Sequence, residues 1–130
     1  MTFRTSTFRC AGHELVYDDY GDPRAEHVLV YVHGLLLDSG INRGIARALS
    51  DHGHRVVLLD LLGHGRSDKP THASEYRIDT YAQQVVGLLD ELEIPSAVLG
   101  GMSLGANVSL FTASLRPDRV LGLVLEMPVL

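Results

Sequence analysis

The sequence predicts an α/β fold, with a mostly parallel sheet that begins in an antiparallel hairpin and is flanked by helices. Four apolar runs of strand length recur along the 130 residues, and segments with helical spacing separate them. Continuous apolar runs are typical of strands buried on both faces of a parallel sheet. Their alternation with helices indicates that helices cover both faces. Because no repeat, low-complexity segment or linker interrupts the chain, we expect residues 1–130 to belong to one domain.

The expected strands begin with the hairpin. Loose alternation of polar and apolar residues predicts two strands, Thr5–Cys10 and Glu14–Tyr20, joined near Ala11-Gly12. The buried strands are then expected in four apolar runs: His27–Gly34, His54–Asp60, Ser96–Gly101 and Val120–Glu126.

Three amphipathic helices are expected between these strands. The predicted core faces are Ile41, Ile45, Ala48 and Leu49 in the first helix, Tyr81, Val85, Leu88 and Leu92 in the second, and Leu104, Val108, Phe111 and Leu115 in the third. A capping box over Thr80–Gln83 is expected to begin the second helix, and Arg116-Pro117 to end the third.

The composition argues against nucleic-acid-binding, membrane and secreted proteins. The net charge is −5, and the eleven Lys and Arg residues form no run, so a nucleic-acid partner is not expected. No apolar stretch approaches the roughly 18 residues of a membrane helix, so no membrane association is expected either. The N-terminus lacks the apolar segment of a secretory signal, and the single cysteine, Cys10, excludes an internal disulfide. We therefore expect a cytoplasmic protein.

One short segment contains a candidate catalytic residue. Gly101-Met102-Ser103-Leu104-Gly105 is a G-x-S-x-G pattern between an expected strand and an expected helix. The glycine spacing does not fit a dinucleotide fingerprint, and no lysine follows to complete a P-loop. The pattern is typical of a sharp turn that presents a nucleophilic serine, with small residues where the strand and helix backbones approach closely. The alternative is a helix-capping serine between packing glycines.

Two further motifs accompany this pattern. His33-Gly34 ends the first buried strand, and the segment Asp60–Pro70, DLLGHGRSDKP, follows the second. Together, the three ordered motifs resemble those of the α/β-hydrolase superfamily, in its serine-nucleophile branch. The resemblance covers essentially the whole chain and implies the first six strands of an eight-stranded fold.

The resemblance also implies roles for residues near the site. Ser103 would be the nucleophile, and the backbone N–H groups of Leu35 and Leu104 would form the oxyanion hole. The residues expected to shape the loops beside the site, without carrying protons, are His33, Gly34, Asp60, Gly101 and Gly105. For His33, a structural role is favoured over that of catalytic base.

The rest of the triad is expected to lie mostly outside this chain. In the superfamily the acid and then the histidine follow the serine, but all seven histidines precede Ser103. Glu126 is a candidate acid at a strand end, or a polar residue at a strand exit; Asp118 is expected to be exposed on the opposite edge. We therefore expect the N-terminal part of a single domain, truncated after the sixth strand, inactive alone and prone to self-association because an edge strand is left unpaired.

The resemblance implies a serine hydrolase that acts on a small-molecule ester or related acyl compound through an acyl-enzyme on Ser103. It implies no metal and no organic cofactor. A serine at this position disfavours the epoxide-hydrolase and haloalkane-dehalogenase branches, which use aspartate, and leaves carbon–carbon hydrolases and perhydrolases open. The alternative is a catalytically inactive binding module or a truncated fragment.

Overall fold

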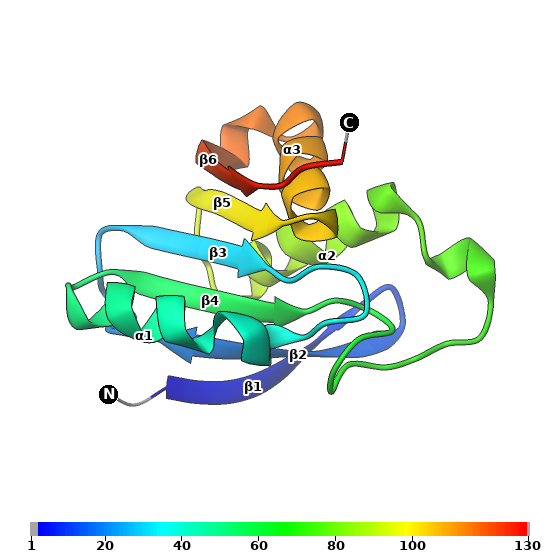
Figure 1. The fold of residues 1–130 in the computed structure, drawn as a ribbon, viewed down its shortest axis with the longest axis horizontal. Coiled ribbons are helices and arrows are strands. Elements are labelled where there is room, and N and C mark those ends of the chain that lie inside the picture. The colour runs from blue at the N-terminus through cyan, green and yellow to red at the C-terminus, as the bar shows by residue number, and fades with distance from the viewer. Residues whose placement is uncertain (1–2, 130) are drawn as a thin grey trace.

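The protein forms one six-stranded sheet with helices on both faces (Figure 1). The computed structural model describes residues 3–129. The strands are β1 (Phe3–Cys10), β2 (His13–Tyr20), β3 (Val28–Val32), β4 (Arg55–Asp60), β5 (Ala97–Met102) and β6 (Val120–Glu126). The α-helices are α1 (Arg43–Asp51), α2 (Ile78–Glu91) and α3 (Leu104–Leu115). Short 3-10 helices occupy Ser39–Asn42, Ala73–Glu75 and Pro117–Arg119.

The strand order is β1-β2-β4-β3-β5-β6. The hairpin β1–β2 is antiparallel and joins the sheet through an antiparallel pairing of β2 with β4. From there β4, β3, β5 and β6 are parallel to one another. The predicted fold class, the hairpin and the four buried runs are therefore confirmed, with strand ends that differ by a few residues. The carboxyl ends of the four parallel strands meet at one edge of the sheet (Figure 1).

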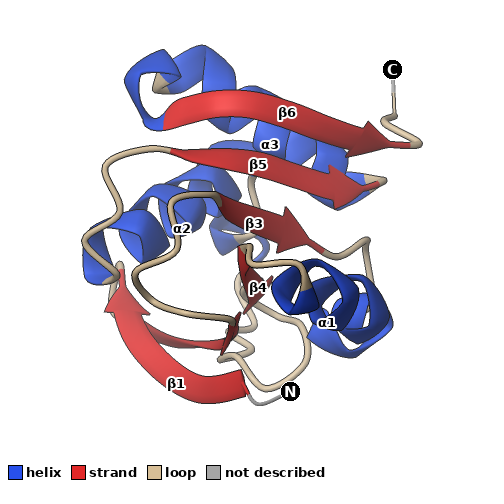
Figure 2. Cartoon of the chain, turned by 90° about the vertical axis from the view of Figure 1, so that its left-hand side faces the viewer, coloured by secondary structure: helices blue, strands red, loops and turns tan. Residues whose placement is uncertain are grey.

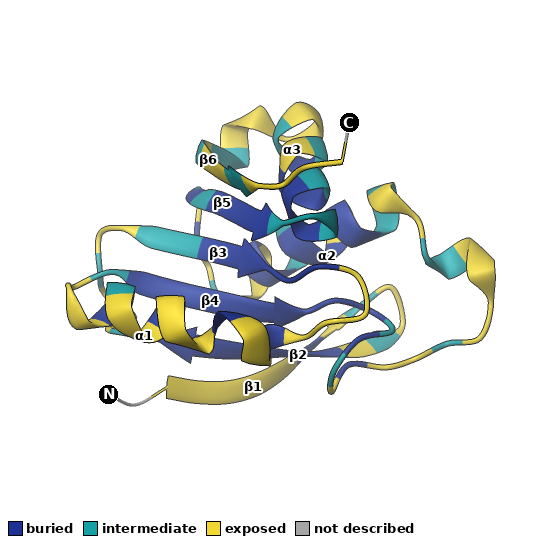
Figure 3. Cartoon of the chain, in the orientation of Figure 1, coloured by how far each residue is buried: buried dark blue, intermediate teal, exposed yellow. Residues whose placement is uncertain are grey.

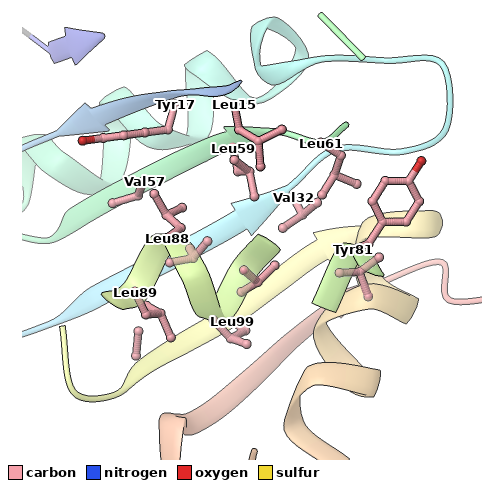
Figure 4. Packing of buried hydrophobic residues seen from close by; sticks show 14 of the residues in the cluster. Leu15, Tyr17, Val32, Val57, Leu59, Leu61, Tyr81, Leu88, Leu89 and Leu99 are labelled. Carbon is pink, nitrogen blue, oxygen red and sulfur yellow. The ribbon is translucent and has the colours of Figure 1, made fainter. Parts of the chain in front are cut away.

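The helix α1 covers one face of the sheet, and α2 and α3 cover the other (Figure 2). The buried apolar side chains form two clusters, one on each face. On the face covered by α2 and α3, inward side chains of the strands pack against α2 (Figure 4). Leu59 and Leu88 in this cluster are fully buried. On the other face, α1 covers a smaller cluster: Tyr20, Tyr31, Ala46, Val56 and Leu58.

The predicted buried face of α1 is right for Leu49, which packs against this smaller cluster, but wrong for Ile41, Ile45 and Ala48, which are exposed. Ile41 and Ile45 are 57% and 40% exposed, whereas Asn42, Ala46 and Ser50 are buried. These three residues are spaced by four, so they lie on one side of the helical segment. A small residue such as Ala46 lets the helix approach the sheet closely, which turns the larger isoleucines outward.

The other two helices also differ from the prediction in detail. The helix α2 begins at Ile78, with Arg77 at the cap position and no side-chain cap, so the capping box expected at Thr80 is absent. The packing expected of the second helix is confirmed for Tyr81, Val85 and Leu88. In α3, Leu115 is 52% exposed, and the side facing the sheet consists mainly of small residues: Gly105, Ala106, Val108, Ser109 and Thr112.

Burial is uneven across the sheet (Figure 3). All six residues of β4 are buried, but none of β6 is, and Leu121 in that strand is 71% exposed. This contrast follows from position, because β4 lies between two strands and β6 forms an edge of the sheet. In the part of the chain that the structure describes, no helix is long and apolar enough to cross a membrane.

Candidate active site

Ser103 stands at a sharp turn between β5 and α3. Its backbone φ and ψ angles are 52° and −114°, a region that side-chain-bearing residues rarely adopt. The Ser103 N–H donates to the backbone carbonyl of Glu126 at 2.9 Å, which joins the turn to the end of β6. The Ser103 hydroxyl makes no capping hydrogen bond to α3, so the alternative of a helix-capping serine does not hold. The turn that the G-x-S-x-G pattern predicts is present.

The two glycines of the pattern are needed for steric reasons. A Cβ atom on Gly105 would overlap the backbone carbonyl of Val32, and one on Gly101 would lie 2.6 Å from that same oxygen. Real Cβ atoms do not come this close to backbone atoms. The end of β3, the end of β5 and the first turn of α3 therefore pack with backbone against backbone, which fixes where Ser103 is presented.

The loop after β3 lies beside Ser103. A Cβ atom built on Gly34 would be in ordinary contact with Ser103 Cβ, 3.6 Å away. The loop then makes a turn closed by a 3.1 Å hydrogen bond from the Leu37 N–H to the Gly34 carbonyl. Among residues 3–129, the Leu35 and Leu104 amides have no hydrogen-bond acceptor. Two free N–H groups thus belong to the segments that meet at the serine.

His33 is fully buried at the base of this loop. Its Nδ1 lies 2.8 Å from the Gly34 carbonyl oxygen, and its Nε2 lies 3.0 Å from the Leu61 backbone nitrogen. The Leu61 N–H can donate only to an unprotonated Nε2, so Nδ1 carries the hydrogen and donates to Gly34. Burial lowers the pKa of the imidazole below its ordinary value, against an opposing effect of the Gly34 contact. Both ring nitrogens are occupied by backbone groups, which favours a structural role.

Asp60 ties the loop after β3 to the end of β4. The carboxylate is fully buried and accepts hydrogen bonds from the Ser39 N–H at 2.8 Å and from the Ser39 hydroxyl. Its other oxygen accepts from the Arg66 backbone N–H at 3.1 Å and from Arg66 Nε at 2.8 Å. Burial raises the pKa of this carboxyl, but the hydrogen bonds from Ser39 and Arg66 outweigh burial and hold the pKa below its ordinary value.

Arg66 extends this network to β2, a connection that the sequence analysis missed. Its two terminal nitrogens donate to the Asp18 carboxylate at 3.1 and 3.2 Å, and Asp18 is fully buried. Thr5 also donates to Asp18, at 2.6 Å. Only the position of Arg66 inside the segment Asp60–Pro70 could have indicated its role, because Asp18 and Ser39 lie far away in the sequence.

The two candidate acids lie in different places. Glu126 ends β6 opposite Met102 and is exposed, and its carboxylate accepts a hydrogen bond from the hydroxyl of the buried Tyr31. Asp118 lies before β6, at the opposite end of that strand, and pairs with Arg116 at 3.0 Å on the surface, as expected. Glu126 therefore lies at the edge that holds Ser103, and Asp118 does not.

The histidines do not complete a triad within the part of the chain that the structure describes. No hydrogen bond of residues 3–129 joins a histidine to the Ser103 hydroxyl. His64, in the loop after β4, is buried with its Nδ1 3.0 Å from the Leu62 carbonyl oxygen, and its Nε2 has no partner among these residues. Over the same range, no three His, Cys, Asp or Glu side chains are grouped so that they could hold a metal ion.

Sequence comparisons relate this chain to known proteins. A family model described as the alpha/beta hydrolase fold matches residues 27–130. A non-heme chloroperoxidase from Streptomyces lividans is 35% identical over 119 residues, which cover 91% of this chain and 42% of that protein. An epoxide hydrolase from Caballeronia sordidicola is 37% identical over 91 residues, which cover 70% and 28%.

Solved structures are also similar. A thioesterase domain from the curacin biosynthetic pathway superposes with a TM-score of 0.88 at 29% identity, covering 96% of this chain and 46% of that domain. The chain therefore spans less than half the length of each of these similar proteins.

Proposed function

The chain belongs to the alpha/beta hydrolase fold family, and from this premise we propose that it supplies the nucleophile and oxyanion donors of a serine hydrolase acting on an ester or related acyl compound. The observation that carries the proposal is the turn at Ser103, with its positive φ angle and its hydroxyl left free of the helix cap. A serine held in this way needs a base to become nucleophilic. The proposal therefore places the catalytic histidine, the lid and the remaining strands in a part of the protein beyond these 130 residues.

The proposed reaction proceeds through an acyl-enzyme. The Ser103 oxygen attacks the substrate carbonyl carbon while the base takes the hydroxyl proton, and the carbonyl oxygen becomes negatively charged. The Leu35 and Leu104 N–H groups stabilise that oxyanion, with an effect of about 3 kcal/mol for one such donor. The intermediate then expels the alcohol with its proton, and water hydrolyses the acyl group from Ser103.

The proposed substrate class is an acyl compound. The thioesterase similarity supports acyl chemistry, whereas the names of the chloroperoxidase and epoxide hydrolase relatives point to other reactions of the same fold. The serine in the turn supports the acyl assignment, because a serine oxygen attacks carbonyl carbon to give a hydrolysable ester. Glu126 remains the candidate acid within this chain.

Labelling by a fluorophosphonate tests the proposal on the complete protein that contains this chain. The activated serine displaces fluoride and keeps the phosphonyl group, so mass spectrometry should locate the adduct on Ser103. Ser103→Ala should abolish labelling and ester hydrolysis, and Ser114→Ala, which changes an exposed serine of α3, should leave both unchanged. A folded complete protein that neither labels nor hydrolyses esters would contradict the proposal and favour a non-catalytic binding module.

A further inference from the structure

We propose that a cavity beside the hairpin β1–β2 binds a small uncharged polyol, a function separate from the proposed hydrolysis at Ser103. The cavity has a volume of about 200 Å³, below the roughly 300–1,000 Å³ of pockets for drug-sized ligands, so it suits a molecule no larger than a monosaccharide. Its lining residues lie between positions 10 and 84, and β1 forms the edge of the sheet opposite β6. The cavity is therefore built without the last strand of this chain.

Four segments form its walls. They are the end of the hairpin, the start of the loop after β4, the 3-10 helix Ala73–Glu75 and the first turns of α2. The hairpin reaches this loop because β2 runs antiparallel to β4, which brings the start of β2 to the end of β4 (Figure 1). Segments far apart in the sequence thus enclose one polar space.

A buried amide is the observation that indicates a ligand. Gln84 lines the cavity and is only 3% exposed. Its Oε1 accepts from the Leu62 backbone N–H at 3.0 Å, which fixes the orientation of the amide. Its Nε2 makes no hydrogen bond to another group of residues 3–129. Because Leu62 takes the oxygen, the NH₂ group is the part of Gln84 left for the cavity. A buried donor without an acceptor is costly, and a ligand oxygen at this point would remove that cost.

Two hydroxyl groups belong to the same cavity. Ser74 and Thr80 both line it, and neither hydroxyl is hydrogen-bonded within residues 3–129. A hydroxyl group can donate one hydrogen bond and accept others. With the Gln84 amide as a further donor, the cavity can pair with several hydroxyls of one ligand, and a polyol carries such groups on neighbouring carbons.

The charges of the cavity favour an uncharged ligand. Among the described residues, its lining contains no Lys, Arg or Asp. Its single carboxylate, Glu75, is already paired with His13, whose Nε2 lies 2.6 Å from Glu75 Oε1. Burial raises the pKa of the Cys10 thiol above its ordinary value, so this group stays neutral. An anion would find no free cation here, and a cation would have to displace His13.

Titration of the complete protein with D-glucose tests the inference. The NMR signals of the Gln84 side-chain amide and the Leu62 backbone amide should shift and saturate, with a dissociation constant of about 1 mM, because a few hydrogen bonds in a preformed site give weak affinity. D-glucuronate and D-glucosamine carry an anionic or a cationic group on the same ring. Each should bind at least about tenfold more weakly, because its charge would be desolvated without a partner.

Two variants change the polar groups of the cavity. Thr80→Val removes a hydroxyl but keeps the side-chain shape, and should weaken D-glucose binding about fivefold. Gln84→Glu keeps an oxygen for Leu62 and replaces the donor by an acceptor, and should weaken binding about tenfold. The matched control is Thr71→Val, which changes an exposed threonine outside the lining and should bind like the wild type.

Each contrary result would overturn the inference. If D-glucose shifted neither signal, water alone would satisfy the Gln84 amide. Equal affinity for a charged sugar would exclude the selection against charge, and wild-type affinity in Thr80→Val would exclude the hydroxyl contact, whether or not Gln84→Glu folds. Ser103→Ala should bind D-glucose like the wild type. Loss of ester hydrolysis and loss of D-glucose binding are therefore separate results, and failure of this inference leaves the proposed function intact.

Discussion

The turn after β5 and the loop after β4 lie at the same edge of the sheet but are held by opposite means. The turn at Gly101–Gly105 is fixed by the lack of side chains, because three backbone segments come into direct contact around it. The loop from Asp60 to Ser67 is fixed by side chains, through a buried network that reaches Asp18 and Ser39. The turn has no room for an added atom on its glycines. The loop, in contrast, can lose single hydrogen bonds one at a time.

The largest expected effect is that of a methyl group in the turn. Gly105→Ala places a Cβ against the Val32 carbonyl, and because the obstacle is backbone we expect a loss of about 3 kcal/mol or more in the free energy of unfolding. Urea denaturation of the complete protein followed by circular dichroism would measure it. Gly44→Ala is the matched control: its Cβ meets nothing within 4 Å in α1, so it should stabilise by about 0.5–1 kcal/mol. Equal midpoints for Gly105→Ala and wild type would show that the backbones are not in contact.

The difference between the two regions also explains what the sequence could predict. The turn at Ser103 is specified by five consecutive residues, so its pattern is visible in the sequence and the structure contains it. The network around Asp60 joins β2, the loop after β3 and the loop after β4. Arg66 and Asp18 are 48 residues apart, and only folding brings them together.

The secondary structure was also predictable from the sequence only in part. Continuous apolar runs identified the four parallel strands, because strands covered on both faces need apolar residues throughout. The buried side of α1 is predicted correctly at Leu49 but not at Ile41 and Ile45, because the smaller Ala46 and Ser50 are the residues that are buried. Apolar periodicity predicts that the large apolar residues of a helix face the core. Where a helix approaches a sheet closely, small residues face the sheet instead, and the periodicity does not show how close that approach is.

A smaller effect is expected when one hydrogen-bonded charge is removed from the network. Asp60→Asn takes away a charge that accepts from Ser39 and Arg66, and we expect a loss of about 2 kcal/mol, since Arg66 is 38% exposed and water screens part of the interaction. The matched control, Asp118→Asn, removes a carboxylate from an exposed, solvent-screened ion pair and should leave the free energy of unfolding nearly unchanged.

The pH dependence of this loss has a defined sign. The folded-state pKa of Asp60 lies below its ordinary value, so the stabilisation is present above about pH 4 and is lost as the pH falls through the folded pKa. The unfolding free energies of wild type and Asp60→Asn should therefore converge as the pH is lowered from 6 to 3. A difference that stays constant over this range would show that the carboxylate charge does not contribute.

The smallest effect we predict concerns His33, which lies under the same loop. Burial lowers its pKa in the folded state, so below its ordinary value of about 6.5 the unfolded chain binds a proton that the folded chain resists. This residue should thus hardly affect stability above about pH 7, and by pH 5.5 it should have lowered stability by at most about 1.4 kcal/mol relative to high pH. His64, 4.8 Å away between ring centroids, adds to this resistance, while Asp60 and Asp38 oppose it.

Thermal denaturation of the complete protein between pH 7.5 and 5.5 would measure this dependence. His33→Asn should lower stability at every pH, because it loses contacts to Gly34 and Leu61, but it should flatten the slope below pH 6.5. His72→Asn changes an exposed histidine and should keep the wild-type slope. If His33→Asn retained that slope as well, the proton would bind elsewhere. The loop beside Ser103 would then be held by the Asp60 network alone, and the histidine beneath it would contribute packing without pH sensitivity.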